Sequence, residues 1–372
     1  MGGAKKIMTV FGTRPEAIKM APLVRMLDEE EGIKSVLCVT AQHREMLDQA
    51  LGLFRLKPDY DLNIMRPSQT LGAVTACVLA GVEGVIERER PDAILVHGDT
   101  TTTFAAALAG FYAKCKVGHV EAGLRTHDRH SPFPEEMNRT LAGRLADFHF
   151  APTQGNRDNL LREGVAADSV FVTGNTVIDA LLDVAGMPYD FSEGCLADID
   201  FEGRRVIAVT CHRRENLGRN MTAIFSAIRD IAEAFDDVEI VYPVHMNPKV
   251  RCAADRLLRG APRVRLIDPL DYLPFVKLMS RACLIITDSG GMQEEAPALG
   301  KPVLVVRKET ERPEAVEAGT VRLAGVKRED IRRIASELLT DGEAYARMAR
   351  AANPYGDGNA CRRIVDILKD RI

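Results

Sequence analysis

The chain has 372 residues, of which 46% are hydrophobic and 27% charged, and its formal net charge is −4. This length exceeds what one hydrophobic core usually supports, so we expect two domains. The small negative charge gives no general attraction to nucleic acid or to an anionic membrane, and any basic site must therefore be local.

Localisation and redox state follow from simple patterns. No apolar run approaches the ~18 residues that a membrane-spanning helix needs, and the N-terminus passes directly into a strand pattern without the layout of a signal peptide. We therefore expect a cytoplasmic protein. The eight cysteines are scattered and include no CxxC pair. This spacing indicates reduced thiols and predicts neither a disulfide framework nor a zinc site.

Short apolar runs alternate with helical patterns along the whole chain. Such alternation favours parallel sheets with helices on both faces, so we predict an α/β fold of two Rossmann-like domains in tandem. The domains join after Gly174, which divides the chain into residues 1–174 and 175–355, and a final amphipathic helix follows at about 356–372. The predicted strands lie near residues 5–11, 36–41, 93–98, 117–121, 148–152 and 170–173, and then near 205–211, 238–244, 264–268, 284–287, 302–306 and 320–323.

The segment GTRPE follows the first predicted strand and is suited to binding an anion. Gly12 permits a tight turn, and Arg14 offers a planar fork of donors to a phosphate. Pro15 suits the first turn of the helix that follows.

Three isolated acids stand at the ends of apolar runs or in the loop after one. Asp99 and Glu121 each end a run that is typical of a buried parallel strand, and Glu135 lies in a proline-rich loop ahead of a predicted helix at 136–148. Ligands of open α/β sheets bind outside the carboxyl ends of the strands, so we interpret the three acids as one candidate site. Two structural alternatives are that Asp99 caps a helix and that Glu135 only favours a helix dipole.

The second half carries a further set of candidate polar residues. His212 ends the strand pattern VIAVTCH ahead of two arginines, which places a switchable donor near a phosphate or sugar, unless it is a solvated or capping residue. Glu295 could bind ribose hydroxyls, or it could simply lie on a solvated helix face. Arg312 could bind a phosphate, or it could form a surface ion pair. In TDSGGMQEEAP, the end of a predicted strand leads directly into a helix. The turn between them consists of Ser289, Gly290 and Gly291, and its exposed N–H groups would suit a diphosphate. The alternative is that this turn is merely flexible.

Several motifs are missing. No GxGxxG follows the first strand and no GxxxxGK[ST] occurs, so neither a dinucleotide fingerprint nor a P-loop is supported. His127 and His130 have the spacing of a metal pair, but no third ligand follows at a familiar distance. We therefore expect no metal and no cofactor.

Nine motifs follow one another along nearly the whole chain: GTRPE, TAQHREMLDQ, HGDT, VEAGLRT, SPFPEEMNR, HRRENLG, PLDYLPF, TDSGGMQEEAP and ERPEAV. Together they resemble those of the non-hydrolysing UDP-N-acetylglucosamine 2-epimerase family. The resemblance implies a glycosyltransferase-B-like fold, with two Rossmann-like domains facing a cleft and the last helix packing back on the first domain. It also implies a homodimer that works without nicotinamide or metal.

The activity that the resemblance implies is the interconversion of UDP-N-acetylglucosamine and UDP-N-acetylmannosamine. The route would be anti elimination of UDP to 2-acetamidoglucal, followed by syn re-addition. Three alternatives stay open: a hydrolysing epimerase, which releases UDP and N-acetylmannosamine, a glycosyltransferase of similar architecture, and a UDP-sugar sensor without activity.

The resemblance also implies roles for individual residues. The catalytic residues would be Asp99, Glu121, Glu135 and His212, with the division of roles among the acids left open. UDP and its phosphates and ribose would contact Arg14, Lys19, Phe275, Ser289, Gly290, Gly291, Glu295 and Arg312. A second, regulatory substrate site would include Gln42, His43, Gln69 and His245.

Overall fold

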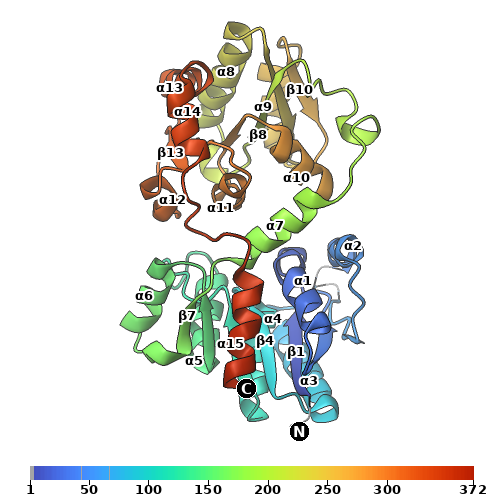
Figure 1. Ribbon diagram of the computed structural model, residues 1–372. Coiled ribbons are helices and arrows are strands. Elements are labelled where there is room, and N and C mark those ends of the chain that lie inside the picture. Colours follow the sequence, from blue (N-terminus) through green and yellow to red (C-terminus); the bar gives the residue numbers. More distant parts are fainter. Residues whose placement is uncertain (1–3, 43, 67) are drawn as a thin grey trace. The chain divides into compact units, whose positions relative to one another are not determined.

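The computed structural model describes residues 4–42, 44–66 and 68–372 of the chain (Figure 1). The described residues form two compact units, one that runs to Ala180 and also includes Tyr355–Ile372, and one of Leu181–Pro354. His43, which we placed in a regulatory site, lies outside the described residues. Among the helices that are described, none is both long and apolar enough to cross a membrane.

The first unit contains a seven-stranded sheet in the order β3-β2-β1-β4-β5-β6-β7, and all its strand pairs are parallel. The expected strands are present, and β3 adds a two-residue edge strand that the sequence pattern did not predict. The central strand β4 is buried throughout, because its sequence AILVH lies inside the hydrophobic core. The strands are β1 (Lys5–Phe11), β2 (Ile33–Val39), β3 (Tyr60–Asp61), β4 (Ala93–His97), β5 (Lys116–Val120), β6 (Phe148–Ala151) and β7 (Val170–Val172).

Helices follow the strands of this sheet in regular alternation. The C-terminal helix α15 packs on α1 within the first unit, and Arg362 and Lys369 both form ion pairs with Glu30 at the end of α1 (Figure 1). The helices are α1 (Arg14–Glu29), α2 (Arg44–Phe54), α3 (Leu71–Glu89), α4 (Thr101–Tyr112), α5 (Glu135–Leu145), α6 (Gln154–Arg162), η1 (Ala167–Ser169), α7 (Thr176–Gly186) and α15 (Ala360–Arg371).

The two units separate within α7, a few residues beyond the expected join at Gly174. The reason lies in the first turn of α7. Its Asp179 carboxylate accepts hydrogen bonds from the backbone N–H groups of Ala360 at 3.2 Å and Cys361 at 2.9 Å. These bonds join the start of α7 to the start of α15, so the turn belongs to the first unit.

The second unit contains a six-stranded sheet in the order β10-β9-β8-β11-β12-β13, again with only parallel pairs. The prediction of two parallel α/β sheets is therefore confirmed. The strands are β8 (Arg205–Thr210), β9 (Val238–Pro243), β10 (Val264–Ile267), β11 (Leu284–Thr287), β12 (Val303–Val305) and β13 (Val321–Leu323). The helices are η2 (Gly194–Leu196), η3 (Arg214–Asn216), α8 (Arg219–Ala234), α9 (Pro248–Leu258), α10 (Tyr272–Arg281), α11 (Gly290–Ala298), α12 (Pro313–Glu317), α13 (Arg328–Thr340) and α14 (Gly342–Ala349).

Candidate active site

The candidate residues of the first unit gather where the strand order reverses. β1 and β4 are neighbours in the sheet, but the chain continues from β1 to β2 on one side and from β4 to β5 on the other. Such a switch point leaves a crevice outside the carboxyl ends of the strands, where ligands of open α/β sheets bind. The segments that follow β1, β4 and β5 carry Arg14, Asp99 and Glu121.

The turn after β1 is packed too closely for any side chain at Gly12. A Cβ at this position would lie 2.1 Å from Thr40 Oγ1 and 2.7 Å from Thr102 Oγ1. The buried Glu16 carboxylate accepts hydrogen bonds from the Gly12 N–H at 3.1 Å and from Thr100 Oγ1 at 2.7 Å. One carboxylate therefore ties the turn after β1 to the start of α4, next to Asp99.

Glu121 follows the last residue of β5 with a left-handed backbone, at φ 61°. Non-glycine residues seldom adopt this conformation, and such outliers gather at functional sites. Glu121 Oε2 is ion-paired with Lys19, accepts a hydrogen bond from Asn175 Nδ2 at 3.1 Å and lies 3.6 Å from His97 Nε2. Burial alone would raise the pKa of Glu121, but the Lys19 ammonium and the His97 imidazole outweigh it and hold the pKa well below its usual range. Glu121 is therefore ionised at neutral pH, as a general base must be.

Asp99 follows β4 but does not cap the next helix. Thr100 is the N-cap of α4, and its Oγ1 accepts a hydrogen bond from the Thr103 N–H at 3.1 Å. The capping alternative for Asp99 is therefore wrong. Its carboxylate is ion-paired with Arg139, and its backbone carbonyl accepts a hydrogen bond from Asn138 Nδ2 at 2.9 Å. Both partners belong to α5, so that helix holds Asp99 in place.

Glu135 is the first residue of α5, whereas the sequence placed it in the preceding loop. Asn138 and Arg139 follow it by three and four positions, so the two partners of Asp99 share a helix face with Glu135. Glu135 Oε2 is buried and accepts no hydrogen bond from the described residues. A buried acceptor without a donor is costly, so this oxygen is suited to a donor from a ligand.

The candidate residues of the second unit also lie at a reversal of strand order. β8 and β11 are neighbours, and the chain continues from β8 to β9 on one side and from β11 to β12 on the other. His212 follows β8, and Asp288 and Ser289 follow β11. The two units therefore repeat one arrangement, in which polar residues stand at the carboxyl ends of the two central strands.

His212 is held by a fully buried carboxylate and by a second imidazole. Asp288 accepts hydrogen bonds from the His212 N–H at 3.0 and 2.9 Å, and its Oδ1 lies 3.7 Å from His212 Nδ1. The His245 ring stacks on the His212 ring at a centroid distance of 5.1 Å. Burial lowers the pKa of the His212 imidazole, Asp288 opposes this, and His245 and Arg213 lower the pKa further. An anion that comes close would therefore raise the pKa of the imidazole again and favour its protonated form.

The Ser-Gly-Gly segment begins a helix, as expected. Ser289 is the N-cap of α11, and its side chain makes no capping hydrogen bond. A Cβ at Gly290 would lie 3.6 Å from Arg213 Nη2, and one at Gly291 would lie 3.3 Å from Glu295 Oε1. A positive helix end, an arginine and a glutamate therefore surround this turn.

The remaining candidates of the second unit border the same region. Glu295 is in α11, and its Oε2 accepts a hydrogen bond from the Tyr272 hydroxyl at 3.3 Å. Phe275 is half-buried in α10, and Arg312 precedes α12 in an ion pair with Glu294. That pair is well shielded, with side-chain exposures of 15% for Arg312 and 7% for Glu294, so it is not the surface pair of the alternative interpretation.

The residues assigned to a regulatory site are divided between the units. In the first unit, Gln42 Oε1 accepts a hydrogen bond from Thr102 Oγ1 at 3.4 Å, and Gln69 binds the backbone of Arg66. In the second unit, His245 stacks on His212. The structure therefore places one regulatory candidate directly on a catalytic candidate.

Sequence reasoning missed several residues that hold the candidate acids and His212. Asp288 stands in TDSGG, where the pattern indicates a phosphate-binding turn at the glycines and gives no separate signal for the acid. Arg139 and Glu136 were visible in SPFPEEMNR, where Glu136 accepts a 3.3 Å ion-pair bond from Arg139. His97 ends the apolar run AILVH and gave no separate signal. No group of three or more potential metal ligands is found in the part of the chain that is described.

The sequence of the chain is similar to those of known proteins. The family model described as UDP-N-acetylglucosamine 2-epimerase matches residues 25–369. The chain belongs to the UDP-N-acetylglucosamine 2-epimerase family. The UDP-N-acetylglucosamine 2-epimerase of Escherichia coli strain K12 is 57% identical in an alignment of length 371 that covers 98% of this chain and 98% of the other.

Two solved structures of the family carry ligands. The UDP-GlcNAc 2-epimerase of Neisseria meningitidis, bound to UDP-GlcNAc, is 49% identical with a TM-score of 0.84, over 98% of this chain and 100% of the other. The UDP-GlcNAc 2-epimerase of Methanocaldococcus jannaschii, in complex with UDP-GlcNAc and UDP, is 35% identical with a TM-score of 0.76, over 98% of this chain and 99% of the other. The similarity therefore covers both units, in keeping with a UDP-N-acetylglucosamine 2-epimerase of glycosyltransferase-B-like fold.

Proposed function

We propose that the protein reversibly epimerises UDP-N-acetylglucosamine at C2 to UDP-N-acetylmannosamine without consuming water. The observation that supports this most strongly is the contrast between Glu121 and Glu135. Glu121 is kept ionised by Lys19 and His97, whereas Glu135 has a buried oxygen without a donor. Carboxyl groups in such different surroundings suit two separate proton transfers.

The chemistry explains why an epimerase of this kind needs more than one acid. The C2 hydrogen has no adjacent carbonyl and is barely acidic, so it leaves only while C1 gains positive character by losing UDP. In the elimination, the C1–O bond breaks, its electron pair leaves with the UDP β-phosphate, and a carboxylate takes the C2 proton. The electrons of the C2–H bond then form the C1–C2 double bond of 2-acetamidoglucal.

The return step delivers a proton to the opposite face of C2. A phosphate oxygen of UDP attacks C1 from the side on which it left, which yields the manno product and releases no free sugar. Two of Asp99, Glu121 and Glu135 act as the proton carriers, and the third stabilises positive charge at C1. Each proton transfer contributes about 10²–10⁴-fold to the rate.

The leaving diphosphate needs positive charge and donors. We assign Arg14 and Lys19 of the first unit and His212 and Arg312 of the second unit to neutralising or protonating the phosphates. Ser289, Gly290 and Gly291 offer N–H groups at the start of α11. Glu295 binds the ribose hydroxyls, and Phe275 borders the uracil.

Regulation by substrate is a further part of the proposal. Gln42, Gln69 and His245 belong to a second substrate site, so the rate depends sigmoidally on UDP-N-acetylglucosamine concentration. The enzyme acts as a cytoplasmic homodimer. Hyperbolic kinetics over a wide substrate range would refute the second site.

Product analysis tests the proposed reaction. The purified protein is incubated with UDP-N-acetylglucosamine alone, and the products are separated by ion-exchange chromatography and identified by NMR. We expect UDP-N-acetylmannosamine to accumulate to a constant ratio with its epimer. Stoichiometric release of UDP and free N-acetylmannosamine would refute the proposal in favour of hydrolysis, and no turnover without an added acceptor would favour a glycosyltransferase.

A further inference from the structure

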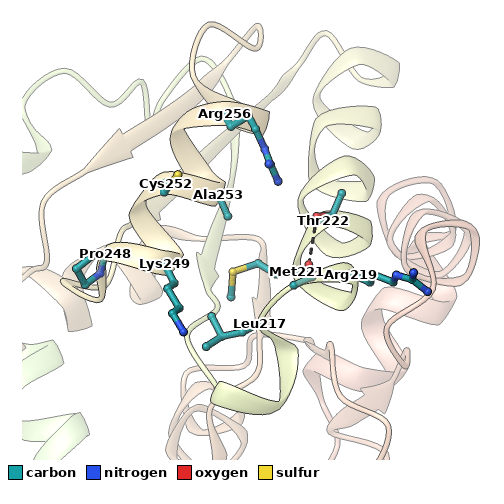
Figure 2. Close-up of a pocket in the computed structure, with 10 residues that line it drawn as sticks. Leu217, Arg219, Met221, Thr222, Pro248, Lys249, Cys252, Ala253 and Arg256 are labelled. Carbon is teal, nitrogen blue, oxygen red and sulfur yellow. Dashed lines mark hydrogen bonds between the residues drawn. The ribbon is translucent and has the colours of Figure 1, made fainter.

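A cavity of about 720 Å³ lies between α8 and α9 of the second unit (Figure 2). This volume is in the range that small-molecule sites occupy. Its apolar lining includes Leu217, Met221 and Ala253, of which Met221 is buried. None of the residues proposed for epimerisation lines it.

Among the described residues, three cations and no acid line this cavity: Arg219, Lys249 and Arg256. Arg219 begins α8, while Lys249 and Arg256 lie seven positions apart in α9 and so share one helix face. Figure 2 shows the Arg256 side chain extending toward α8 and the Lys249 side chain extending toward Leu217, with Ala253 between them. The cations therefore stand around an apolar floor.

These cations differ from the other arginines of the same two helices. Arg229 of α8 pairs with Glu233, and Arg251 of α9 pairs with Asp268. Arg259, just after α9, pairs with Asp255. In contrast, Arg219, Lys249 and Arg256 make no ion pair with any described residue. A cluster of like charges without counter-ions is unfavourable by itself, and an anion would relieve it.

We propose that this cavity is a second ligand site, which binds a small phosphate-bearing metabolite. The phosphate lies among the three cations, and the carbon-rich part of the ligand covers Leu217, Met221 and Ala253. The site is independent of the proposed epimerisation. It is nevertheless connected to the candidate active site through the chain, because Leu217 directly follows Asn216, whose Nδ2 binds the Asp288 carboxylate at 3.0 Å.

Cys252 gives a local readout of this site. It lines the cavity and is exposed, and Cys77 and Cys195 are also exposed but lie elsewhere. The probe reagents are the dianionic disulfide dithiobis(nitrobenzoate) and the neutral disulfide dithiodipyridine, and labelling of each cysteine is followed by peptide mass spectrometry. Because the cations concentrate an anionic reagent, we expect the ratio of anionic to neutral labelling rates to be about 10-fold higher at Cys252 than at the other two cysteines in low salt.

Variants separate this site from the total charge of the helices. Combined Lys249→Gln and Arg256→Gln should remove the advantage of the anionic reagent at Cys252. Combined Arg229→Gln and Arg251→Gln, which removes the same charge from α8 and α9 outside the cavity, should retain it. Circular dichroism and the epimerase rate show that each variant is folded.

Protection by an anion completes the test. Inorganic pyrophosphate at millimolar concentration should slow neutral labelling of Cys252 at least about 5-fold in the wild type and leave it unchanged in the Lys249→Gln, Arg256→Gln variant. Equal protection in the Lys249→Gln, Arg256→Gln variant would instead trace the effect to pyrophosphate bound at the catalytic residues and would contradict the proposal. The proposal is wrong if the rate ratio at Cys252 equals those at Cys77 and Cys195, or if pyrophosphate gives no protection in the wild type.

Discussion

The Asp288 carboxylate, just after β11, binds the backbone of His212, which follows the neighbouring strand β8. It accepts the His212 backbone N–H at 3.0 and 2.9 Å and stands 3.7 Å from the ring nitrogen Nδ1. It is fully buried and also accepts the Arg213 N–H at 2.8 Å. One carboxylate therefore sets both the position of His212 and the charge that the imidazole experiences.

Replacing Asp288 with asparagine should impair His212 in a recognisable way. The charge of Asp288 raises the pKa of His212 and so opposes the effect of burial. Without that charge the pKa of His212 falls, and the imidazole loses its proton at a lower pH. We expect the alkaline limb of the kcat profile to move to lower pH and kcat at pH 8 to fall about 10–100-fold. The new amide also faces backbone donors with its own N–H₂ group, which costs about 1–3 kcal/mol of unfolding free energy. An unshifted pH profile would contradict this account of Asp288.

Replacing Glu121 with glutamine should slow proton transfer and leave nucleotide binding intact. The amide keeps the size of the side chain but can no longer accept a proton, so kcat should fall by about 10²–10⁴-fold. The dissociation constant for UDP, measured by calorimetry, should change less than about 3-fold. Glu89→Gln is the matched control, because Glu89 is also a part-buried, lysine-paired carboxylate of the first unit. Equal losses of activity in both variants would show a general structural effect.

Replacing Lys19 with methionine should make the enzyme sensitive to acid. In the wild type the pKa of Glu121 lies well below 4.5, so the stabilisation that its charge gives is present above about pH 4.5 and is lost as the pH falls through the lower value of the folded state. Without Lys19, His97 remains to oppose the effect of burial, so the pKa of Glu121 rises from its lowered value. We expect the acidic limb of kcat/KM to move to higher pH and the unfolding free energy at pH 7 to drop by about 1–3 kcal/mol. Urea denaturation at several pH values measures the unfolding free energy of the wild type and of the variant. An unchanged acidic limb of kcat/KM would contradict the role of Lys19.

Replacing Gly12 with alanine should destabilise the first unit. The new Cβ would lie 2.1 Å from Thr40 Oγ1, so the turn after β1 must shift. We expect a loss of about 1–3 kcal/mol in urea denaturation, together with a higher KM because Arg14 is displaced. The control is Gly52→Ala in α2, where a Cβ meets nothing within 4 Å and should stabilise the helix by about 0.5–1 kcal/mol. Equal effects of both changes on stability would contradict the close packing at Gly12.

Much of the fold follows from patterns that act over a few residues. The apolar runs predicted nearly every strand, because a parallel strand that is buried on both faces must be apolar throughout. β3 was missed because a two-residue edge strand, Tyr60–Asp61, has no room for a pattern. The two units separate within α7 rather than at Gly174, because the Ala360 and Cys361 N–H groups donate hydrogen bonds to Asp179 from positions far away in the sequence.

In the candidate site, too, the sequence indicates residues with a local pattern and does not indicate contacts between distant residues. Sequence could indicate Asp99, Glu121 and His212, since each stands alone at the end of an apolar run. It could not indicate their partners, because an ion pair between Arg139 and Asp99 is a property of the packing of α5 and not of its sequence. Nor could it distinguish the charge states of the acids, since the ionisation of Glu121, just after β5, depends on Lys19 of α1, which is far away in the sequence.

The central claim is that hydrogen leaves C2 and returns from the enzyme while UDP detaches and reattaches. The measurement that tests it most directly is the incubation of the protein with UDP-N-acetylglucosamine in D₂O, with C2 followed by NMR. We expect deuterium at C2 of the UDP-N-acetylmannosamine that forms, and strongly reduced incorporation with the Glu121→Gln variant. A manno product that retains its original C2 hydrogen throughout would contradict the account.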